Sequence, residues 1–337
     1  MVDLTCTYLG LALANPLVPS SSPLTGSPDA ARHLEDAGAA AIVMPSLFEE
    51  VILEEQARLD RFLDEQSLGH GEADSFRPMP VGYQSREEKY LETIATLKDT
   101  LSIPVIASLN GTTTGGWIEH ALALEEAGAD ALEVNVYYLP ASPEDTAANV
   151  EARYVDVATA LLGQVKIPVT VKLTSQLTAP LDLIRQLDAA GVRGVSLFNR
   201  FYQPDIDLDT LDVTPSLALS TPEEALLRVR WAAMLFGQSN CDIAVTGGFH
   251  NAADALKALL AGANVVHLCS VLLREGPGAL STILDDMRSW LEEKEYDSIE
   301  QLRGSVSQRH APNPSQYARA NYIDVIDNYS TPAGVRY

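Results

Sequence analysis

The stretch VTGGFHNAADALKALLAGANVVHLCSVLLREGP, residues 245–277, contains the unit from which the fold is predicted. One apolar run ends in Gly247-Gly248, a helix-like segment follows, and a second apolar run ends at Cys269-Ser270. An Ala-Gly pair joins the helix to the second run. Glycine is the preferred residue just past a helix C-terminus because it accepts a positive φ. The stretch therefore predicts a strand, a helix and a second strand in succession.

The same junction of helix and strand recurs along the chain. In each copy an amphipathic segment ends in Ala-Gly, and an apolar run begins shortly afterwards. The four copies are EDAGAAAIVM (35–44), EEAGADALEV (125–134), DAAGVRGVSL (188–197) and LLAGANVVHL (259–268). Helix followed by strand is therefore the working unit of the sequence.

Further apolar runs complete the series, and they are continuous rather than alternating, as expected for strands covered on both faces. The predicted strands are 16–21, 40–46, 104–110, 131–138, 168–174, 194–199, 242–248 and 264–270. The predicted helices are 28–37, 85–99, 117–127, 144–163, 180–190, 221–237, 251–261 and 278–293. Eight strands alternating with eight helices predict a (β/α)8 barrel, with an open doubly wound sheet as the alternative.

The chain is longer than a typical barrel, so additions are expected. We predict a barrel over residues 1–303 and a C-terminal extension over 304–337. An acidic insertion at 49–80 follows the second predicted strand, and it is therefore expected at the C-terminal face of the barrel, where active sites are built.

Composition excludes several classes of protein. The 337 residues carry a formal net charge of −23, which argues against nucleic-acid partners and against an anionic membrane surface. Three widely spaced cysteines give no disulfide framework, and six histidines without HxxxH or HxH spacing give no metal site. We expect no signal peptide, and the sequence contains no long apolar span, no P-loop and no GxSxG elbow. We expect a cytoplasmic protein.

In a barrel, the C-terminal ends of the strands converge on one site. The residues at these predicted ends are polar, and Lys172 is the only cation among them. They are Ser20, Ser21, Met44, Ser46, Ser108, Asn110, Asn135, Tyr137, Tyr138, Lys172, Asn199, Gly247, Gly248, Cys269 and Ser270.

Backbone N–H groups after the last two strands predict a phosphate site, because glycine lets the backbone approach an anion closely. The alternative is that Gly247 and Gly248 only form a tight turn. Lys172 lies within an apolar strand, where burial without a partner is costly, so it is either functional or held in a salt bridge. Asn135 and Asn199 are predicted to contact a ligand or to fix a loop.

With these residues in this order, the sequence resembles the dihydroorotate dehydrogenase family of FMN-dependent (β/α)8 barrels, particularly its soluble class. The resemblance extends from about residue 3 to about residue 303. It is carried by LTCTYLGLALANPLVPSSSPLT (4–25), LEVNV (132–136), VTVKLT (169–174) and AVTGGFHNAADALKALLAGANVVHLCSVLLREGP (244–277).

The resemblance implies FMN as cofactor and a role for each matching residue. Gly247, Gly248, Cys269 and Ser270 would hold the FMN phosphate, while Ser20 and Ser21 would lie against the isoalloxazine ring. Asn135 would contact flavin or substrate, and we assign Asn110 and Asn199 to the same cofactor site. Lys172 would lie at the N1–C2=O edge, where a cation stabilises the anionic reduced ring.

The sequence departs from the family at the substrate side. The family has a loop of Asn-x-Ser-Cys-Pro-Asn after the fourth strand, and its cysteine is the base. Here Tyr138 occupies that position, although tyrosine, with a pKa near 10, is a poor base at neutral pH. A family lysine after the second strand is replaced within Met44-Pro45-Ser46, and the family's Gly-Leu-Pro-Asn loop is missing from 67–85.

These departures predict an FMN-dependent oxidoreductase that acts on the CH–CH group of a small cyclic substrate other than dihydroorotate. Lys172 supports the reduced ring, and Tyr138 or a serine exchanges the proton. One alternative is a flavoprotein that exchanges electrons with a protein partner, using the aromatic tail after residue 304, although that tail could equally pack on its own barrel. Another is a flavin-free lyase or isomerase acting on a phosphate ligand. The soluble class also implies a homodimer.

Overall fold

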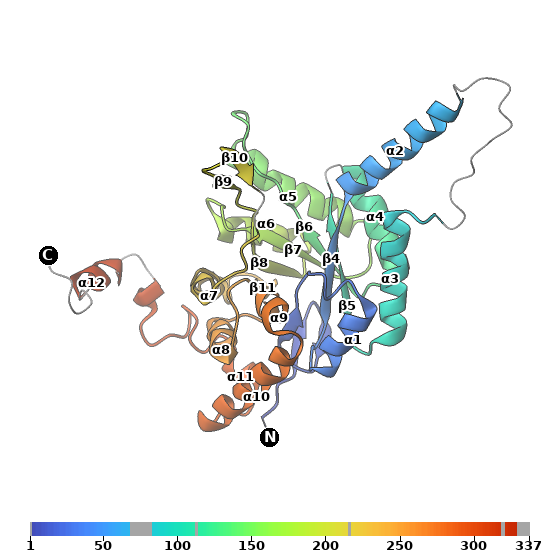
Figure 1. The fold of residues 1–337 in the computed structure, drawn as a ribbon. Coiled ribbons are helices and arrows are strands. Elements are labelled where there is room, and N and C mark those ends of the chain that lie inside the picture. The colour runs from blue at the N-terminus through green and yellow to red at the C-terminus, as the bar shows by residue number, and fades with distance from the viewer. Residues whose placement is uncertain (1, 68–82, 112–113, 215–216, 318–320, 329–337) are drawn as a thin grey trace.

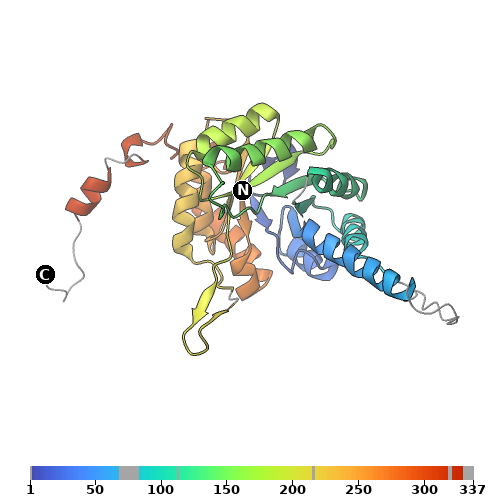
Figure 2. The ribbon, with the colours of Figure 1, turned by 90° about the horizontal axis from the view of Figure 1, so that it is seen from above.

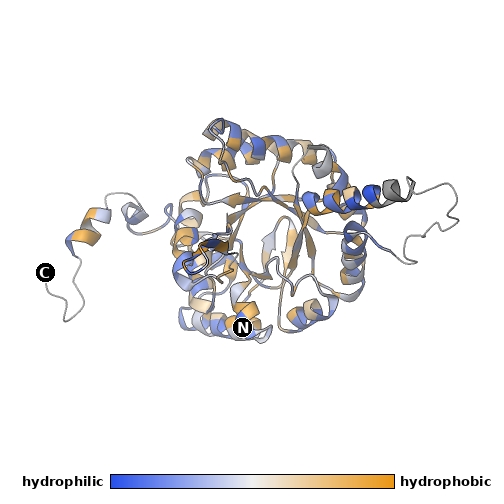
Figure 3. Ribbon diagram, turned by 45° about the horizontal axis from the view of Figure 1, so that its top comes forward, coloured by the Kyte–Doolittle hydropathy of each residue, from blue (hydrophilic) through white to orange (hydrophobic). Residues whose placement is uncertain are grey.

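The computed structural model of this chain describes residues 2–67, 83–111, 114–214, 217–317 and 321–328. A closed ring of parallel strands, surrounded by helices, dominates the molecule (Figure 1 and Figure 3). The eight strands are β3 (Leu17–Pro19), β4 (Ile42–Phe48), β5 (Val105–Asn110), β6 (Ala131–Asn135), β7 (Val169–Thr174), β8 (Gly194–Asn199), β11 (Asp242–Thr246) and β12 (Val265–Leu268).

The order of strands in the sheet decides between the two predicted folds. It runs β3-β12-β11-β8-β7-β6-β5-β4, which is the order of the chain read around a circle. The ring closes where the Ala40 N–H, just before β4, donates to the Leu17 carbonyl of β3 over 3.1 Å. A doubly wound sheet would reverse its order at a switch point. The prediction of a (β/α)8 barrel is confirmed, and the open-sheet alternative is wrong.

The helices lie between the strands and cover the outside of the ring. They are α1 (Pro28–Asp36), α3 (Arg86–Thr100), α4 (Thr114–Glu126), α5 (Ala147–Leu162), α6 (Pro180–Ala190), α7 (Ala225–Leu235), α8 (Ala252–Ala261) and α10 (Gly278–Glu293), with shorter η1 (Pro222–Glu224), α9 (Ser270–Glu275) and α11 (Ile299–Leu302). Each of the four Ala-Gly junctions has its glycine at positive φ, at Gly38, Gly128, Gly191 and Gly262. The recurring pattern therefore ends helices as predicted.

The N-terminal end of the barrel is plugged by a hairpin that the sequence pattern does not predict. It pairs β1 (Cys6–Tyr8) with β2 (Leu11–Leu13), and it places the fully buried Tyr8 side chain inside the ring. The Leu9 N–H donates to an Asp242 carboxylate oxygen over 2.7 Å, which ties the hairpin to β11. With this end closed, the opposite end is the one available for a site.

Two additions to the barrel rise from its C-terminal face. The helix α2 (Glu49–Ser67) leaves the C-terminal end of β4 and projects outward, so the start of the predicted insertion lies at the expected face (Figure 1 and Figure 2). Residues 68–80 of that insertion fall outside the described residues. A second hairpin, β9 (Asp205–Asp207) with β10 (Asp212–Thr214), also rises from this face.

The C-terminal extension begins on the barrel and then leaves it. The Gly304 N–H donates to the Leu259 carbonyl over 2.9 Å, and the Gln308 N–H donates to the Ala233 carbonyl over 3.0 Å. Beyond these contacts, η2 (Pro314–Tyr317) and α12 (Asn321–Asp327) extend away from the ring (Figure 2). The boundary at residue 303 stays a prediction. Among the described helices, none combines the length and the apolar character needed to cross a bilayer.

Candidate functional site

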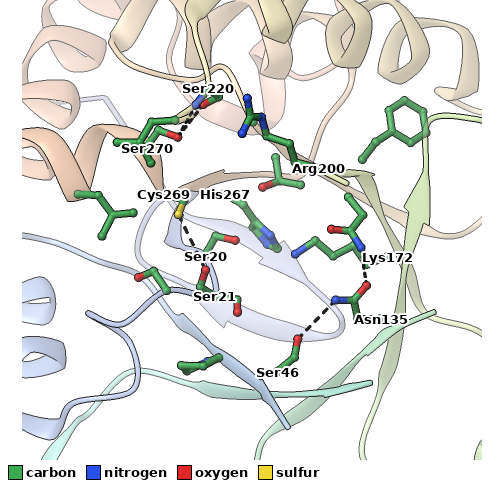
Figure 4. Close-up of a pocket in the computed structure, with 18 of the residues that line it drawn as sticks. Ser20, Ser21, Ser46, Asn135, Lys172, Arg200, Ser220, His267, Cys269 and Ser270 are labelled. Carbon is green, nitrogen blue, oxygen red and sulfur yellow. Dashed lines mark hydrogen bonds between the residues drawn. The ribbon is translucent and has the colours of Figure 1, made fainter. Parts of the chain in front are cut away.

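A cavity of about 520 Å³ lies at the C-terminal ends of the strands (Figure 4). Nine of the ten residues assigned to the cofactor line it: Ser20, Ser21, Asn135, Lys172, Asn199, Gly247, Gly248, Cys269 and Ser270. The volume lies within the range of small-molecule and cofactor sites. Residues far apart in the sequence thus meet as the barrel topology predicts.

One end of the cavity is built around Gly248. Its φ is +94°, and a Cβ there would lie 2.3 Å from the backbone nitrogen of Ala225, at the start of α7. Only glycine therefore fits between the end of β11 and this helix. The neighbouring Gly247 has a φ of +90°, so two consecutive residues adopt backbone conformations that residues other than glycine rarely adopt.

Two hydroxyls that sequence reasoning did not pair complete this end. The Gly248 N–H donates to Ser220 Oγ over 3.2 Å, and Ser220 Oγ lies 2.8 Å from Ser270 Oγ. The Ser220 N–H donates to Ser270 Oγ over 3.0 Å. We call this end, defined by Gly247, Gly248, Ser220 and Ser270, the phosphate end, because backbone N–H groups and short hydroxyls suit a bound phosphate.

Arginine 200 supplies a cation beside the phosphate end. Arg200 lines the cavity, its Nε donates to Glu224 Oε2 over 3.2 Å, and it also donates to the Ala218 carbonyl. Figure 4 shows Arg200 between Ser220 and Lys172. The sequence analysis did not identify Arg200 as a site residue. It lies one position beyond the predicted strand 194–199, in a loop, and residue propensities do not predict the path of a loop.

Lys172 is buried, and its partner is Glu133. Lys172 Nζ donates to Glu133 Oε1 over 3.2 Å, and the glutamate side chain is completely buried. The salt bridge that was one of the two predicted interpretations of Lys172 is therefore present, and because the same side chain lines the cavity, its functional role stays a prediction. Removing one partner of a buried ion pair leaves the other charge buried and uncompensated, which lowers the stability of the fold.

A third polar group, His267 on β12, shares this interior. The imidazole is fully buried, its Nδ1 lies 4.0 Å from Glu133 Oε2, and Tyr8 packs edge-on against the ring. Burial lowers the pKa of His267 to about 4, with Lys172 adding to the effect and Glu133 opposing it. The ring is therefore neutral at physiological pH.

The other end of the cavity is lined by amides and hydroxyls. Asn199 Nδ2 donates to Asn135 Oδ1 over 2.7 Å, Asn135 Nδ2 donates to Ser46 Oγ over 3.5 Å, and Ser46 Oγ lies 2.7 Å from Ser108 Oγ. We call this end of the cavity, defined by Asn135, Asn199, Ser46 and Ser108, the amide end. It can orient a small polar molecule by uncharged hydrogen bonds.

Tyr138 and Asn110 do not line the cavity. The Tyr138 hydroxyl donates to Asp145 Oδ1 over 2.7 Å, and the Arg153 guanidinium lies 3.8 Å from the centre of its ring. The hydrogen bond to Asp145 raises the pKa of Tyr138, which makes it a still poorer base. Asn110 is buried at the end of β5, beside β4. The geometry thus does not bring these predicted residues to the site.

Tyr137 takes the position beside the cavity instead. It lines the amide end, and its hydroxyl accepts a hydrogen bond from the Tyr202 N–H over 2.9 Å. The hydroxyl hydrogen thus remains free to point elsewhere. Residues two apart in an extended chain point to the same side, which agrees with Asn135 and Tyr137 both lining the cavity, whereas the role predicted for Tyr138 rested on its place in the family loop.

The Cys269 thiol at the site is poorly suited to act as a nucleophile. Burial raises the pKa of the Cys269 thiol, and its Sγ contacts the Ser21 carbonyl at 3.9 Å, so a thiolate nucleophile is disfavoured. Within the part of the chain that the structure describes, no three His, Cys, Asp or Glu side chains gather as a metal site requires.

Comparison with known proteins agrees with the site. The sequence profile of the dihydroorotate dehydrogenase family matches residues 81–291, which is more than half of the chain. The chain belongs to the dihydroorotate dehydrogenase family. It is therefore a dehydrogenase of that FMN-dependent type.

Relatives within and near the dihydroorotate dehydrogenase family match most of the chain at low identity. The putative dihydroorotate dehydrogenase A (fumarate) of Aeropyrum pernix is 27% identical over 313 residues, covering 90% of this chain and 97% of that protein. The catalytic subunit of dihydroorotate dehydrogenase B (NAD(+)) of Thermoplasma volcanium is 23% identical, covering 92% and 100%. The chloroplastic dihydropyrimidine dehydrogenase (NADP(+)) of Arabidopsis thaliana is 24% identical, covering 90% and 76%.

Proposed function

We propose that the protein holds FMN in the cavity and uses it to oxidise or reduce the CH–CH group of a small cyclic substrate other than dihydroorotate. The observation that carries the proposal is the contrast between the two ends of one cavity. The phosphate end has a close backbone turn at Gly248 that suits a phosphate, whereas Tyr138 and Met44-Pro45-Ser46 stand where the resemblance implies the family's base and lysine.

The residues of the phosphate end fit the cofactor. Gly247 and Gly248 with the Ser270 and Ser220 hydroxyls would hold the phosphate, and Arg200 would balance its charge. Ser20 and Ser21 would lie against the ring, while Lys172 would face the edge that becomes negative. When bound, the flavin supplies hydride transfer.

The amide end supports an uncharged, cyclic amide-like substrate. Asn135, Asn199 and Ser46 would orient its carbonyl and N–H groups. Tyr137, rather than the predicted Tyr138, would move the proton, because its hydroxyl borders the cavity and is fixed by the Tyr202 N–H. Met44-Pro45-Ser46, where the resemblance implies a family lysine, offers no cation to the substrate.

The direct test is a spectroscopic screen of the purified protein. The protein is expected to bind FMN with the visible bands of a flavoprotein, and an anaerobic panel of dihydropyrimidines, dihydrouracil-like amides and cyclic imides is expected to contain a compound that bleaches it. A protein that takes up no added FMN would refute the cofactor assignment. It would leave the phosphate-ligand lyase or isomerase as the function.

We also propose a homodimer, through the apolar face of the β9–β10 hairpin. Leu208 and Leu211 at its tip are 83% and 81% exposed, and Ile206 pairs with Val213 on the same face. Exposed apolar surface of this kind is typical of contacts between chains. Light scattering should give a dimer for the wild type and a monomer for Leu208→Asp/Leu211→Asp, while Leu226→Asp, another exposed leucine, should stay dimeric.

An exchange of electrons with a protein partner is the second candidate. It rests on α12, where Tyr322 and Ile323 are 68% and 63% exposed and do not pack on the barrel. A chain truncated after residue 311 should keep its flavin and lose only transfer to that partner. We further propose that the protein is cytoplasmic and has no nucleic-acid partner.

A further inference from the structure

Four of the five buried side-chain atoms that lack a hydrogen-bond partner, within the described residues, belong to strands of the barrel, and one of the side chains that carry them, His267, lines the cavity. They are Glu133 Oε2, Ser196 Oγ and both ring nitrogens of His267. Unpartnered buried polar atoms are rare in folded proteins, and each calls for an explanation. Here two of them belong to one imidazole, His267 on β12, and a third, Glu133 Oε2, lies 4.0 Å from its Nδ1.

The surroundings of His267 keep its ring neutral while the cavity carries no added charge, because burial lowers its pKa to about 4. The charged groups that face it are Glu133 from β6 and Lys172 from β7, and the titratable Tyr8 from β1 packs against its edge. Lys172 is already paired with Glu133 Oε1, so the second carboxylate oxygen, 4.0 Å from His267 Nδ1, is available to an imidazolium. Added negative charge in the cavity would therefore tip His267 towards protonation.

We propose that His267 is the redox-linked proton site of the bound cofactor, taking up one proton when the ring in the cavity is reduced and releasing it on reoxidation. The inference rests on the proposed binding of FMN. His267 lines the cavity, and Figure 4 shows it and Lys172 pointing toward each other across its floor. His267 is a positioning residue in this account, because it acts through charge on the cofactor's edge.

The step balances in electrons and protons. A reductant gives two electrons, the ring takes one proton and keeps one negative charge, and His267 takes a second proton from solvent. Glu133 Oε2 accepts the new N–H, so the imidazolium is not left without a partner. On reoxidation the two electrons leave and both protons return to solvent.

The measurement is the midpoint potential of the FMN-loaded protein against pH, with dithionite as reductant and a reference dye. Each proton coupled to a two-electron reduction changes the potential by about 30 mV per pH unit. Between about pH 5 and about pH 7 the wild type is expected to show twice the slope of His267→Gln, whose amide takes up no proton in this range. His33→Gln, on the exposed face of α1, is the matched control and should keep the wild-type slope.

Equal slopes for the wild type and His267→Gln would overturn the inference. If His267→Gln fails to hold FMN, the nitrogen resonances of His267 in the wild type decide instead. They should be those of a neutral ring with oxidised FMN and of an imidazolium with reduced FMN at the same pH, and an unchanged ring would refute the inference. A protein that binds no FMN would refute the proposed function itself, which keeps the two failures distinct.

Discussion

The two ends of the cavity are built from different parts of the chain. The phosphate end depends on backbone: Gly248 lies against the backbone of α7, and its N–H donates to a serine hydroxyl. The amide end depends on side chains that follow strands, namely Asn135, Asn199 and Ser46. A backbone cradle tolerates few replacements, whereas a set of side chains can change its specificity one residue at a time. This difference supports the proposal that the phosphate end is retained while the amide end has altered.

The largest expected effect falls on the floor that joins the two ends. Lys172→Met strands the Glu133 charge in the barrel interior, and we expect the free energy of unfolding to fall by about 3–5 kcal/mol. The double variant Lys172→Met/Glu133→Gln removes both charges and should recover most of that loss. Urea unfolding of the three proteins measures this. If the double variant is as unstable as the single one, the two residues do not act as a pair.

The phosphate end is tested by adding one methyl group at Gly248. Gly248→Ala forces a shift of the α7 backbone, and we expect FMN affinity to fall roughly 1,000-fold, which is about 4 kcal/mol. Gly276→Ala is the matched control, because Gly276 has a φ of +80° but open space around the position of a Cβ. It should bind FMN nearly as the wild type does. Fluorescence titration of the apoprotein with FMN gives both affinities, and equal losses would mean that strain alone explains them.

Stability at low pH should depend on His267. Its folded pKa of about 4 lies below the value of about 6.5 in the unfolded chain, so the folded state resists protonation. This contribution is fully present above about pH 6.5 and is lost as the pH falls toward 4, by about 3 kcal/mol in total. His267→Gln should show a correspondingly flatter dependence of unfolding free energy on pH. An identical pH profile for the variant would contradict the buried neutral ring.

The smallest predicted effect distinguishes Tyr137, which lines the cavity, from its neighbour Tyr138, which does not. Tyr137→Phe removes the hydroxyl beside the cavity and should slow turnover of a compound that bleaches the protein by about 100-fold. Tyr138→Phe removes only the hydrogen bond to Asp145 and should change turnover by less than about threefold. Steady-state rates with that compound decide. The reverse order would return the proton to Tyr138, as the sequence predicts.

The sequence was sufficient for the fold because its signals are local and repeated. The four Ala-Gly junctions end helices at positive φ, and the continuous apolar runs become the strands of the ring. The two hairpins are not predicted, because each strand has only three residues, too few for a periodic pattern. The helix α2 was expected only as an acidic insertion.

The site was predicted where a residue type alone carries the information. Gly247, Gly248 and Lys172 are unusual at strand ends, and all three line the cavity. Tyr138 was chosen from its place in the family loop, but its hydroxyl donates to Asp145, and Tyr137, two residues after Asn135, lines the cavity. Arg200, Ser220 and His267 were missed, since an arginine or serine in a loop and a histidine in an apolar strand acquire their meaning only from partners distant in the sequence.

The contrast between a retained cofactor end and an altered substrate end is tested most directly by anaerobic titration of the FMN-loaded protein with dihydroorotate. The account predicts that the flavin bands remain unbleached by dihydroorotate, while dithionite bleaches them fully. Bleaching by dihydroorotate at an enzymatic rate would contradict it, and the substrate end would then serve the family's own substrate through different residues.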